Sequence, residues 1–374
     1  MSYTILTNKQ TNKQTNKQTN KQTNKQKYLY IDSLKGLAMI MVILVHIGLG
    51  EDFKYSAFTS NGRFGVQIFF VISGFLALRS YKCHILNGTM TIKTWLKRKI
   101  IKLALLFYVM VIFNSLFFNG LPYYLGDIES GVSILNIFAH FLFIFGLVPH
   151  YMNSIIGVEW YLGVLVLLYL IISVFGKYLN GIRKCIIAIV LSILISKLVV
   201  FIFKHSISPD IIDYEIYAIF FTNFNFIVQL PFFLIGCLLY IIGSDDSCIL
   251  RIRKWSFLSK IIPILALSIY IGTSLNIFKH NHTYLYAIFA FLIILANFLG
   301  GKSLDNKLLA RIGERSYGIY LTHFTLILIF NIYVPVNHQN VTVVYMFCKF
   351  ALILFVSYSI TLLFDNLTNR LKKS

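Results

Sequence analysis

Ten stretches of mainly apolar residues, each about the length that a helix needs to cross a lipid bilayer, recur along the whole chain. A bilayer core of about 30 Å takes about 20 helical residues, and its lack of water favours helices, which satisfy their own backbone groups. Hydrophobic residues make up 57% of the chain and charged residues 13%, against about 25% charged in a soluble domain. The sequence predicts an all-α polytopic membrane helical bundle of about ten transmembrane helices, at about 32–50, 64–81, 100–119, 158–176, 185–204, 225–242, 261–276, 284–299, 316–333 and 343–364.

The charges of this basic chain, net +20, are distributed unevenly between the two sides of the predicted bundle. With the N-terminus inside, the inner segments hold 27 of the 34 Lys and Arg residues, and the outer segments hold Lys54, Arg63, Lys204 and Lys279. This asymmetry follows the positive-inside rule and predicts that both termini are cytoplasmic. The apolar stretch 132–149 is interpreted as a re-entrant or interfacial helix, because a full span there would break the charge pattern downstream. The basicity therefore indicates topology, and we expect no nucleic-acid partner.

Two domains are predicted: a disordered repeat tail over residues 1–27 and a transmembrane domain over residues 28–374. Residues 7–26 are five copies of Thr-Asn-Lys-Gln, a polar tract that cannot bury a core. The five cysteines fall in spans or on the inner side and include no CxxC pair, so we expect neither a disulfide framework nor a metal site.

The repeat also has a possible meaning at the level of DNA. Thr-Asn-Lys-Gln can be encoded as ACA AAC AAA CAA, which is the tetranucleotide ACAA repeated three times. Five copies would then form a tandem tract in which gain or loss of one unit shifts the reading frame. Such a tract predicts phase variation, in which expression switches on and off among cells. The alternative is a repeat fixed at the protein level as a flexible tail.

Lys35 and His46 are ionisable residues at the two ends of one apolar run. Eleven helical residues make three turns plus about 20°, so the two side chains share one helix face, about 16 Å apart along the axis. An ionisable residue within a membrane usually faces the protein interior or a water-filled cavity. Lys35 is a candidate charge within the bundle or an inner-interface anchor. His46 is a candidate catalytic group or a hydrogen-bonded core histidine.

The segment TWLKRKIIKLALLFY, residues 94–108, carries a basic cluster where a span begins. Lys99 and Lys102 are three residues apart and therefore neighbours on a helix surface, with Arg98 beside them. Such a cluster can bind phosphate groups. The alternative is a charged flank that follows the positive-inside rule.

Five segments occur in an order that points to a known family: YIDSLKGLAMIMVILVH, GRFGVQIFFVISGF, SIIGVEWYLGV, QLPFFLIGCLLY and RIGERSYGIYLTHF. Together they resemble the acyltransferase-3 family of integral-membrane O-acyltransferases, which acylate sugars of bacterial surface glycans and some other acceptors. The resemblance covers the chain from about Tyr28 to about Asp365.

The resemblance implies roles for the residues noted above. The family's basic-x10-His motif falls on Lys35 and His46, with lysine where arginine is usual, and it implies that His46 is catalytic. The family's Arg-x-x-Arg pair falls on Lys99 and Lys102. Lysine keeps the charge but loses the bidentate fork of arginine, which makes a phosphate contact less directional.

The chain departs from the family pattern near Trp160. A glutamate usually follows this tryptophan by five residues, and here that position is Leu165. Glu159 cannot be assumed to replace it, since it lies on a different helix face. The C-terminal sequence FDNLT resembles a Glu-x-Pro ending, with Asp365 and Leu367 in place of the usual residues.

The resemblance implies a membrane O-acyltransferase that transfers acetyl from acetyl-CoA to a hydroxyl of a cell-surface glycan, such as lipopolysaccharide, capsule or exopolysaccharide, or of its lipid-linked precursor. His46 would act as general base or as a transient nucleophile. Lys35 would neutralise charge in the bundle, and Arg98, Lys99 and Lys102 would hold the phosphates of acetyl-CoA. No metal cofactor is expected. The location implied is the bacterial inner membrane, with the bilayer as a partner.

Two other functions fit the same composition. A transporter or flippase for a lipid-linked sugar or organic ion would use the buried charges, with the histidine as a proton relay. A non-enzymatic membrane scaffold would leave the paired ionisable groups without a role.

Overall fold

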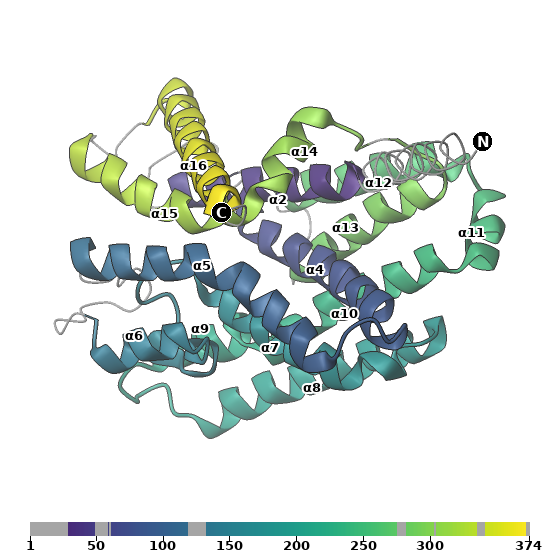
Figure 1. The fold of residues 1–374 in the computed structure, drawn as a ribbon, viewed down its shortest axis with the longest axis horizontal. Coiled ribbons are helices and arrows are strands. Elements are labelled where there is room, and N and C mark those ends of the chain that lie inside the picture. The colour runs from purple at the N-terminus through teal and green to yellow at the C-terminus, as the bar shows by residue number, and fades with distance from the viewer. Residues whose placement is uncertain are drawn as a thin grey trace, which may run out of the picture.

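The computed structural model describes residues 29–48, 59, 61–118, 132–274, 282–302, 304–334 and 341–371. Within these residues the chain forms helices and no strand (Figure 1). Eight segments are long and apolar enough to cross a membrane. They are built on α2 (Leu29–Ile47), α4 (Gly65–Tyr81), α5 (Ile92–Phe118), α7 (Trp160–Phe175), α8 (Ile182–Ser206), α10 (Phe226–Ser244), α15 (Ser316–Tyr333) and α16 (Val343–Leu371). The predicted all-α polytopic membrane fold is confirmed. The predicted tail over residues 1–27 lies outside the described residues.

Two further apolar helices lie where the other two spans were predicted. α12 (Leu258–Ser274) passes the test for a span only together with α11 (Asp246–Arg253), from which it is sharply bent. α13 (His282–Phe298) is a shorter apolar helix. The described chain thus has apolar helices at all ten predicted positions, and eight of these lie in segments that are long and apolar enough to span a membrane.

The apolar stretch 132–149 does not form a span. Its helix α6 (Ile134–Phe141) has eight residues, which at 1.5 Å per residue is about 12 Å. Two short 3₁₀ turns follow, Phe145–Leu147 and Pro149–Tyr151. The segment is therefore too short to cross the bilayer, as the charge pattern predicted. The remaining short helices are α9 (Tyr214–Ile219) and α14 (Lys307–Glu314).

α4 and α10 touch backbone to backbone at a pair of glycines (Figure 1). A Cβ atom added at Gly74 would lie 1.8 Å from the Phe233 carbonyl oxygen, and one added at Gly236 would lie 1.8 Å from the Val71 carbonyl oxygen. Neither distance leaves room for any side chain. In a membrane, where lipid is as apolar as leucine, such close approach is the main source of helix–helix attraction.

α2 and α14 meet in the same reciprocal way. A Cβ atom at Gly36 would lie 2.0 Å from the Leu309 carbonyl oxygen, and one at Gly313 would lie 1.7 Å from the Asp32 carbonyl oxygen. The Ser33 hydroxyl also donates a 2.9 Å hydrogen bond to the Asn306 carbonyl oxygen just before α14. The N-terminal half of α2, which carries Lys35, is therefore fixed against α14.

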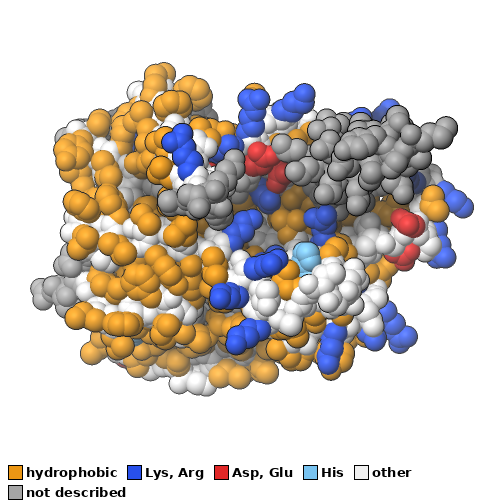
Figure 2. Space-filling model, viewed as in Figure 1, with side chains coloured by type: hydrophobic (Ala, Val, Ile, Leu, Met, Phe, Trp, Pro, Cys, Tyr) orange, Lys and Arg blue, Asp and Glu red, His pale blue; other side chains and the backbone are white. Residues whose placement is uncertain are grey.

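The surface separates apolar side chains from basic ones. Large hydrophobic side chains are exposed along α5, α8 and α16, including Leu116, Leu194 and Phe355, which suits contact with lipid. Figure 2 shows hydrophobic side chains covering the left part of the visible face, and Lys and Arg side chains gathering towards the middle and right. This one-sided distribution agrees with the predicted positive-inside orientation.

The α4–α10 contact gives a direct test of the fold. In an open helix, replacing glycine by alanine stabilises by up to about 1 kcal/mol. We expect Gly74→Ala to do the opposite and to lower the free energy of unfolding by about 1–3 kcal/mol or more, because the added methyl group forces the two backbones apart.

Thermal unfolding of the protein purified in detergent measures this effect. Gly181→Ala is the control, because a Cβ atom there meets nothing within 4 Å. A Gly74→Ala variant as stable as the Gly181→Ala variant would contradict the packing described here.

Candidate functional site

His46 lies in the last turn of α2 and faces α15. Its imidazole ring is 5.3 Å from the ring of His323, centroid to centroid, and the ring of Phe324 meets it edge-on at 5.2 Å. The His46 side chain is half-buried, and its Nδ1 atom is buried without a hydrogen-bond partner among the described residues. The predicted catalytic histidine therefore belongs to a cluster of rings at the contact between two helices.

His323 is the second histidine of this cluster and is fully buried. Its Nδ1 atom lies 2.7 Å from the Tyr320 carbonyl oxygen and 3.2 Å from that of Ile319. Carbonyl oxygens only accept hydrogen bonds, so these partners assign the proton to Nδ1. In the neutral ring the Nε2 atom then carries a lone pair, and within the described chain this buried atom has no partner.

Lys35 occupies the other end of α2 and is paired with an acid. Its Nζ atom lies 2.9 Å from Asp32 Oδ1, one turn earlier on the same helix, and both side chains are partly exposed. The structure thus places Lys35 and His46 on one helix but in separate environments. Among the described residues no hydrogen bond or ion pair joins Lys35 to His46.

The predicted phosphate-binding residues lie in the early turns of α5. This helix begins at Ile92, eight residues before the apolar stretch, because Thr91 caps its first turn by accepting from the Thr94 amide. Arg98 and Lys102 are exposed. Lys99 is half-buried, with its ammonium 5.4 Å from the ring centre of Trp95 and 5.3 Å from that of Tyr169.

Trp95 connects this basic segment to its neighbours. The Trp95 indole donates a 3.0 Å hydrogen bond to the Ser80 hydroxyl, and its ring packs edge-on against Tyr81 of α4 and Tyr169 of α7. The turn that follows α4, Lys82–Leu86, contacts both α5 and the turn Gly176–Tyr178. Cations from three segments therefore gather at one end of the bundle: Lys82, Arg98, Lys99, Lys102 and Lys177.

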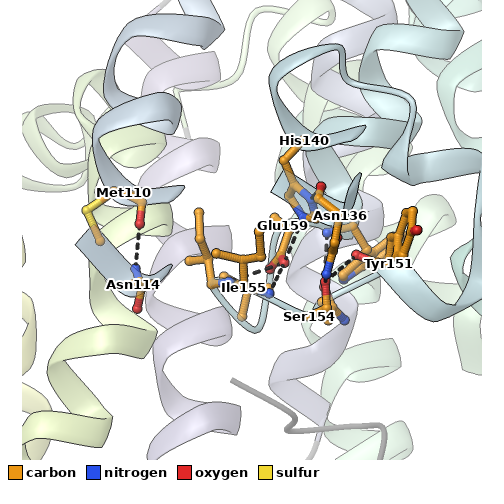
Figure 3. Close-up of polar contacts among 12 residues, drawn as sticks. Met110, Asn114, Asn136, His140, Tyr151, Ser154, Ile155 and Glu159 are labelled. Atoms are coloured by element: carbon orange, nitrogen blue, oxygen red, sulfur yellow. Dashed lines mark hydrogen bonds and ion pairs between the residues drawn. The ribbon is translucent and has the colours of Figure 1, made fainter. Parts of the chain in front are cut away.

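A buried carboxylate lies just before α7. Glu159 is fully buried, and its Oε1 atom accepts from the Ile155 and Ile156 amides at 2.8 and 3.2 Å. The same oxygen lies 3.3 Å from Nε2 of His140, which is also fully buried. Figure 3 shows the carboxylate between His140 and Ile155. Leu165, the position where the family pattern has a glutamate, is a buried apolar residue.

Polar side chains continue this network on the α6 side. The Asn136 amide nitrogen donates to the Ser154 hydroxyl at 2.9 Å, and that hydroxyl lies 2.8 Å from the Tyr151 carbonyl oxygen (Figure 3). The His140 Nδ1 atom in turn lies 2.9 Å from the Asn136 carbonyl oxygen. Glu159 and His140 thus hold the non-spanning segment to the start of α7.

This segment also contacts the histidine cluster. The Tyr320 hydroxyl of α15 donates to the Val158 carbonyl oxygen. Gly157, at a positive φ of 94°, is packed so closely on Phe324 that an added Cβ atom would lie 2.4 Å from its ring. Phe324 therefore lies between His46 and the loop that Glu159 fixes.

Three residues of this region were not identified as site residues from the sequence. Asp32 and His323 lie inside motifs that carry the family resemblance, and His140 lies in the stretch 132–149. An ionisable residue in an apolar segment was the available signal for the two histidines. Their partners come from helices far away in sequence, which no local pattern indicates.

Comparison with known proteins gives one match. A family model described as an acyltransferase domain, that of the acyltransferase-3 family, matches residues 28–362. The chain matches no curated protein and no solved structure at a significant level. Within the described residues, no three His, Cys, Asp or Glu side chains are grouped so as to hold a metal ion.

Proposed function

Since the chain belongs to the acyltransferase-3 family, we propose that it transfers an acetyl group from cytoplasmic acetyl-CoA to a hydroxyl of a bacterial cell-surface glycan or its lipid-linked precursor. The observation that carries this proposal is the position of His46. It is a half-buried imidazole inside an apolar bundle, beside a second buried histidine, and its buried Nδ1 atom has no partner among the described residues. A neutral imidazole can accept a proton and is suited to general-base catalysis.

In the proposed reaction, neutral His46 takes the proton of the acceptor hydroxyl. The hydroxyl oxygen then forms a bond to the thioester carbonyl carbon, and the carbon–sulfur bond breaks. The imidazolium returns its proton to the departing thiolate, which leaves as free CoA. In the alternative, a nitrogen of His46 bonds to the thioester carbonyl carbon as the carbon–sulfur bond breaks. The acceptor hydroxyl oxygen then takes the acetyl group as the nitrogen–carbon bond breaks, and the hydroxyl proton passes to the CoA thiolate.

The donor is proposed to bind by its phosphates at the basic end of the bundle. Arg98 and Lys102 are exposed there, and Lys99 is held over two aromatic rings beside them. In the predicted orientation this end is cytoplasmic, whereas His46 lies in the last turn of α2, towards the other side. The acyl arm of the donor must therefore extend along the bundle to reach His46.

Lys35 has a proposed electrostatic role at the inner end of α2. Its pairing with Asp32 holds the ammonium in place while leaving part of it exposed. The proposed role of this ammonium is to neutralise charge within the bundle. The proposed location of the protein is the bacterial inner membrane.

Substitution of His46 tests the proposed function. We expect purified wild-type protein with acetyl-CoA and an acceptor glycan to release CoA thiol, and His46→Ala to lose this activity by about a hundredfold or more, the usual contribution of an acid–base group. His205→Ala is the matched control, since His205 is an exposed histidine bonded only within its own helix.

Two results would contradict the proposal. Full activity of His46→Ala would remove the catalytic role of this residue. No thiol release by wild-type protein with any acceptor glycan would favour transport of a lipid-linked sugar instead. Mass spectrometry of surface glycans from cells with and without the gene identifies the acceptor.

Neutralising Lys99 and Lys102 tests the donor site. We expect the double variant Lys99→Gln, Lys102→Gln to raise the KM for acetyl-CoA about tenfold or more, because charge-assisted contacts to the phosphates are lost. The KM for the acceptor should stay unchanged. The control is Lys254→Gln with Lys260→Gln, which removes two exposed cations elsewhere on the predicted inner side. A raised KM for the acceptor alone would contradict the assignment.

The Thr-Asn-Lys-Gln repeat is proposed to make expression phase-variable, which suits an enzyme that modifies a surface exposed to immune recognition. Sequencing the locus from many single colonies tests this proposal. We expect tract lengths that differ by single ACAA units, with the glycan modification present only when the reading frame is open. Mixed synonymous codons across the five copies would rule the proposal out, because the DNA would not be a uniform tetranucleotide tract.

A further inference from the structure

The contact between His46 and His323 brings together two buried ring nitrogens that complement each other. The rings come from α2 and α15, lie 5.3 Å apart and are tilted by 51°. The buried nitrogen without a partner is Nδ1 in His46 and Nε2 in His323. Phe324 closes the other side of the His46 ring, so α15 limits how far this imidazole can move.

The two carbonyl oxygens beside His323 determine what each nitrogen can do. They hold the proton of His323 on Nδ1, which leaves the Nε2 atom only able to accept a hydrogen bond. A buried acceptor of this kind is costly unless a donor reaches it. The rings of His46 and Tyr320 both pack against His323, and the Tyr320 hydroxyl already donates to the Val158 carbonyl oxygen, so His46 is the neighbour that can supply a donor. The donor that complements it is a protonated Nδ1 atom of His46.

We propose that His323 is a positioning residue that accepts a hydrogen bond from His46 Nδ1–H and thereby keeps the lone pair of His46 on Nε2. This inference rests on the proposed function, since it assigns the nitrogen of His46 that takes the acceptor's proton. With the ring centres 5.3 Å apart, this bond requires the His46 ring to turn its Nδ1 atom towards His323. His323 plays the part of the group that orients a catalytic base, and the backbone carbonyls of Tyr320 and Ile319 hold His323 in the tautomer that this requires.

The hydrogen bond from His46 to His323 stabilises the His46 ring most when that ring carries the extra proton. The acceptor's proton moves to Nε2 of His46, and the positive charge spreads over both of its nitrogens. The hydrogen bond from Nδ1–H to His323 then becomes charge-assisted and stronger. The proton later leaves from Nε2 to the CoA thiolate. His323 neither gains nor loses a proton in the cycle, which distinguishes its role from that of His46.

A pair of variants of similar size tests this role. His323→Gln supplies a side-chain oxygen that can accept the hydrogen bond, whereas His323→Met fills similar space without a strong acceptor. We expect His323→Met to lower kcat about ten- to a hundredfold, the range that a hydrogen bond to a charged group provides. We expect His323→Gln to retain most of the activity, and KM for acetyl-CoA to stay within about twofold in both variants.

Thr325→Val is the structural control for these variants. Thr325 is a buried residue on the same helix, and its hydroxyl donates to Asn114 Oδ1 rather than to the histidine cluster. If His323 only supports packing, His323→Gln and His323→Met will lose activity equally, or neither will differ from Thr325→Val. Either result would overturn the proposal.

A measurement on the wild-type protein decides the question even if the variants do not fold. Solid-state nitrogen NMR of histidine-labelled protein in lipid bilayers distinguishes a protonated from an unprotonated ring nitrogen. We expect the resting protein to have Nδ1 protonated and Nε2 unprotonated in both His46 and His323, with signals assigned by loss in His46→Ala. A His46 ring protonated on Nε2 would overturn the proposal. This readout needs no turnover, so it fails or succeeds independently of the proposed transferase activity.

Discussion

Backbone contact at glycines is the interaction on which the rest of this bundle depends. Apolar side chains are as stable in contact with lipid as in contact with protein, so the hydrophobic effect does not draw the helices together. The helices attract one another by dispersion, which requires close approach. Gly36 and Gly313 provide this approach between α2 and α14, and Gly74 and Gly236 provide it between α4 and α10. Gly62 and Gly65 press on the backbone of α2 from the α4 side. α2 is therefore held from two directions along its length.

Fixing α2 determines where the candidate base lies. His46 is at the end of this helix that faces α15, and α15 is itself tied down by hydrogen bonds along its length. Tyr317 donates to the Leu103 carbonyl oxygen of α5, Tyr320 to that of Val158, and Thr325 to Asn114 of α5. The two histidines thus face each other from helices that have little freedom to separate. The proton transfer proposed for His46 needs this degree of positioning.

The bundle also separates its charges by depth. Cations gather around the early turns of α5 and the turns beside it, and the buried Glu159–His140 pair lies at the start of α7. A hydrogen bond to a buried carboxylate is costly to break, because the carboxylate is left without that partner. Its effect here is to fix the short non-spanning segment, whose Gly157 packs on Phe324 beside His46. The basic end that is proposed to bind phosphates and the histidine end are thereby kept apart within one scaffold.

The sequence by itself determined the helical membrane fold, the positions of the apolar helices and the non-spanning character of residues 132–149, since these follow from apolar length and charge, which are local properties. It also singled out Lys35, His46 and the α5 cations, because ionisable residues stand out in apolar surroundings. Only the tertiary structure decided their partners: Asp32 for Lys35, two aromatic rings for Lys99, and His323 for His46. The contact between His46 and His323 joins residues 277 positions apart, and it depends on how α2 and α15 pack. No periodicity or spacing within one segment carries that information.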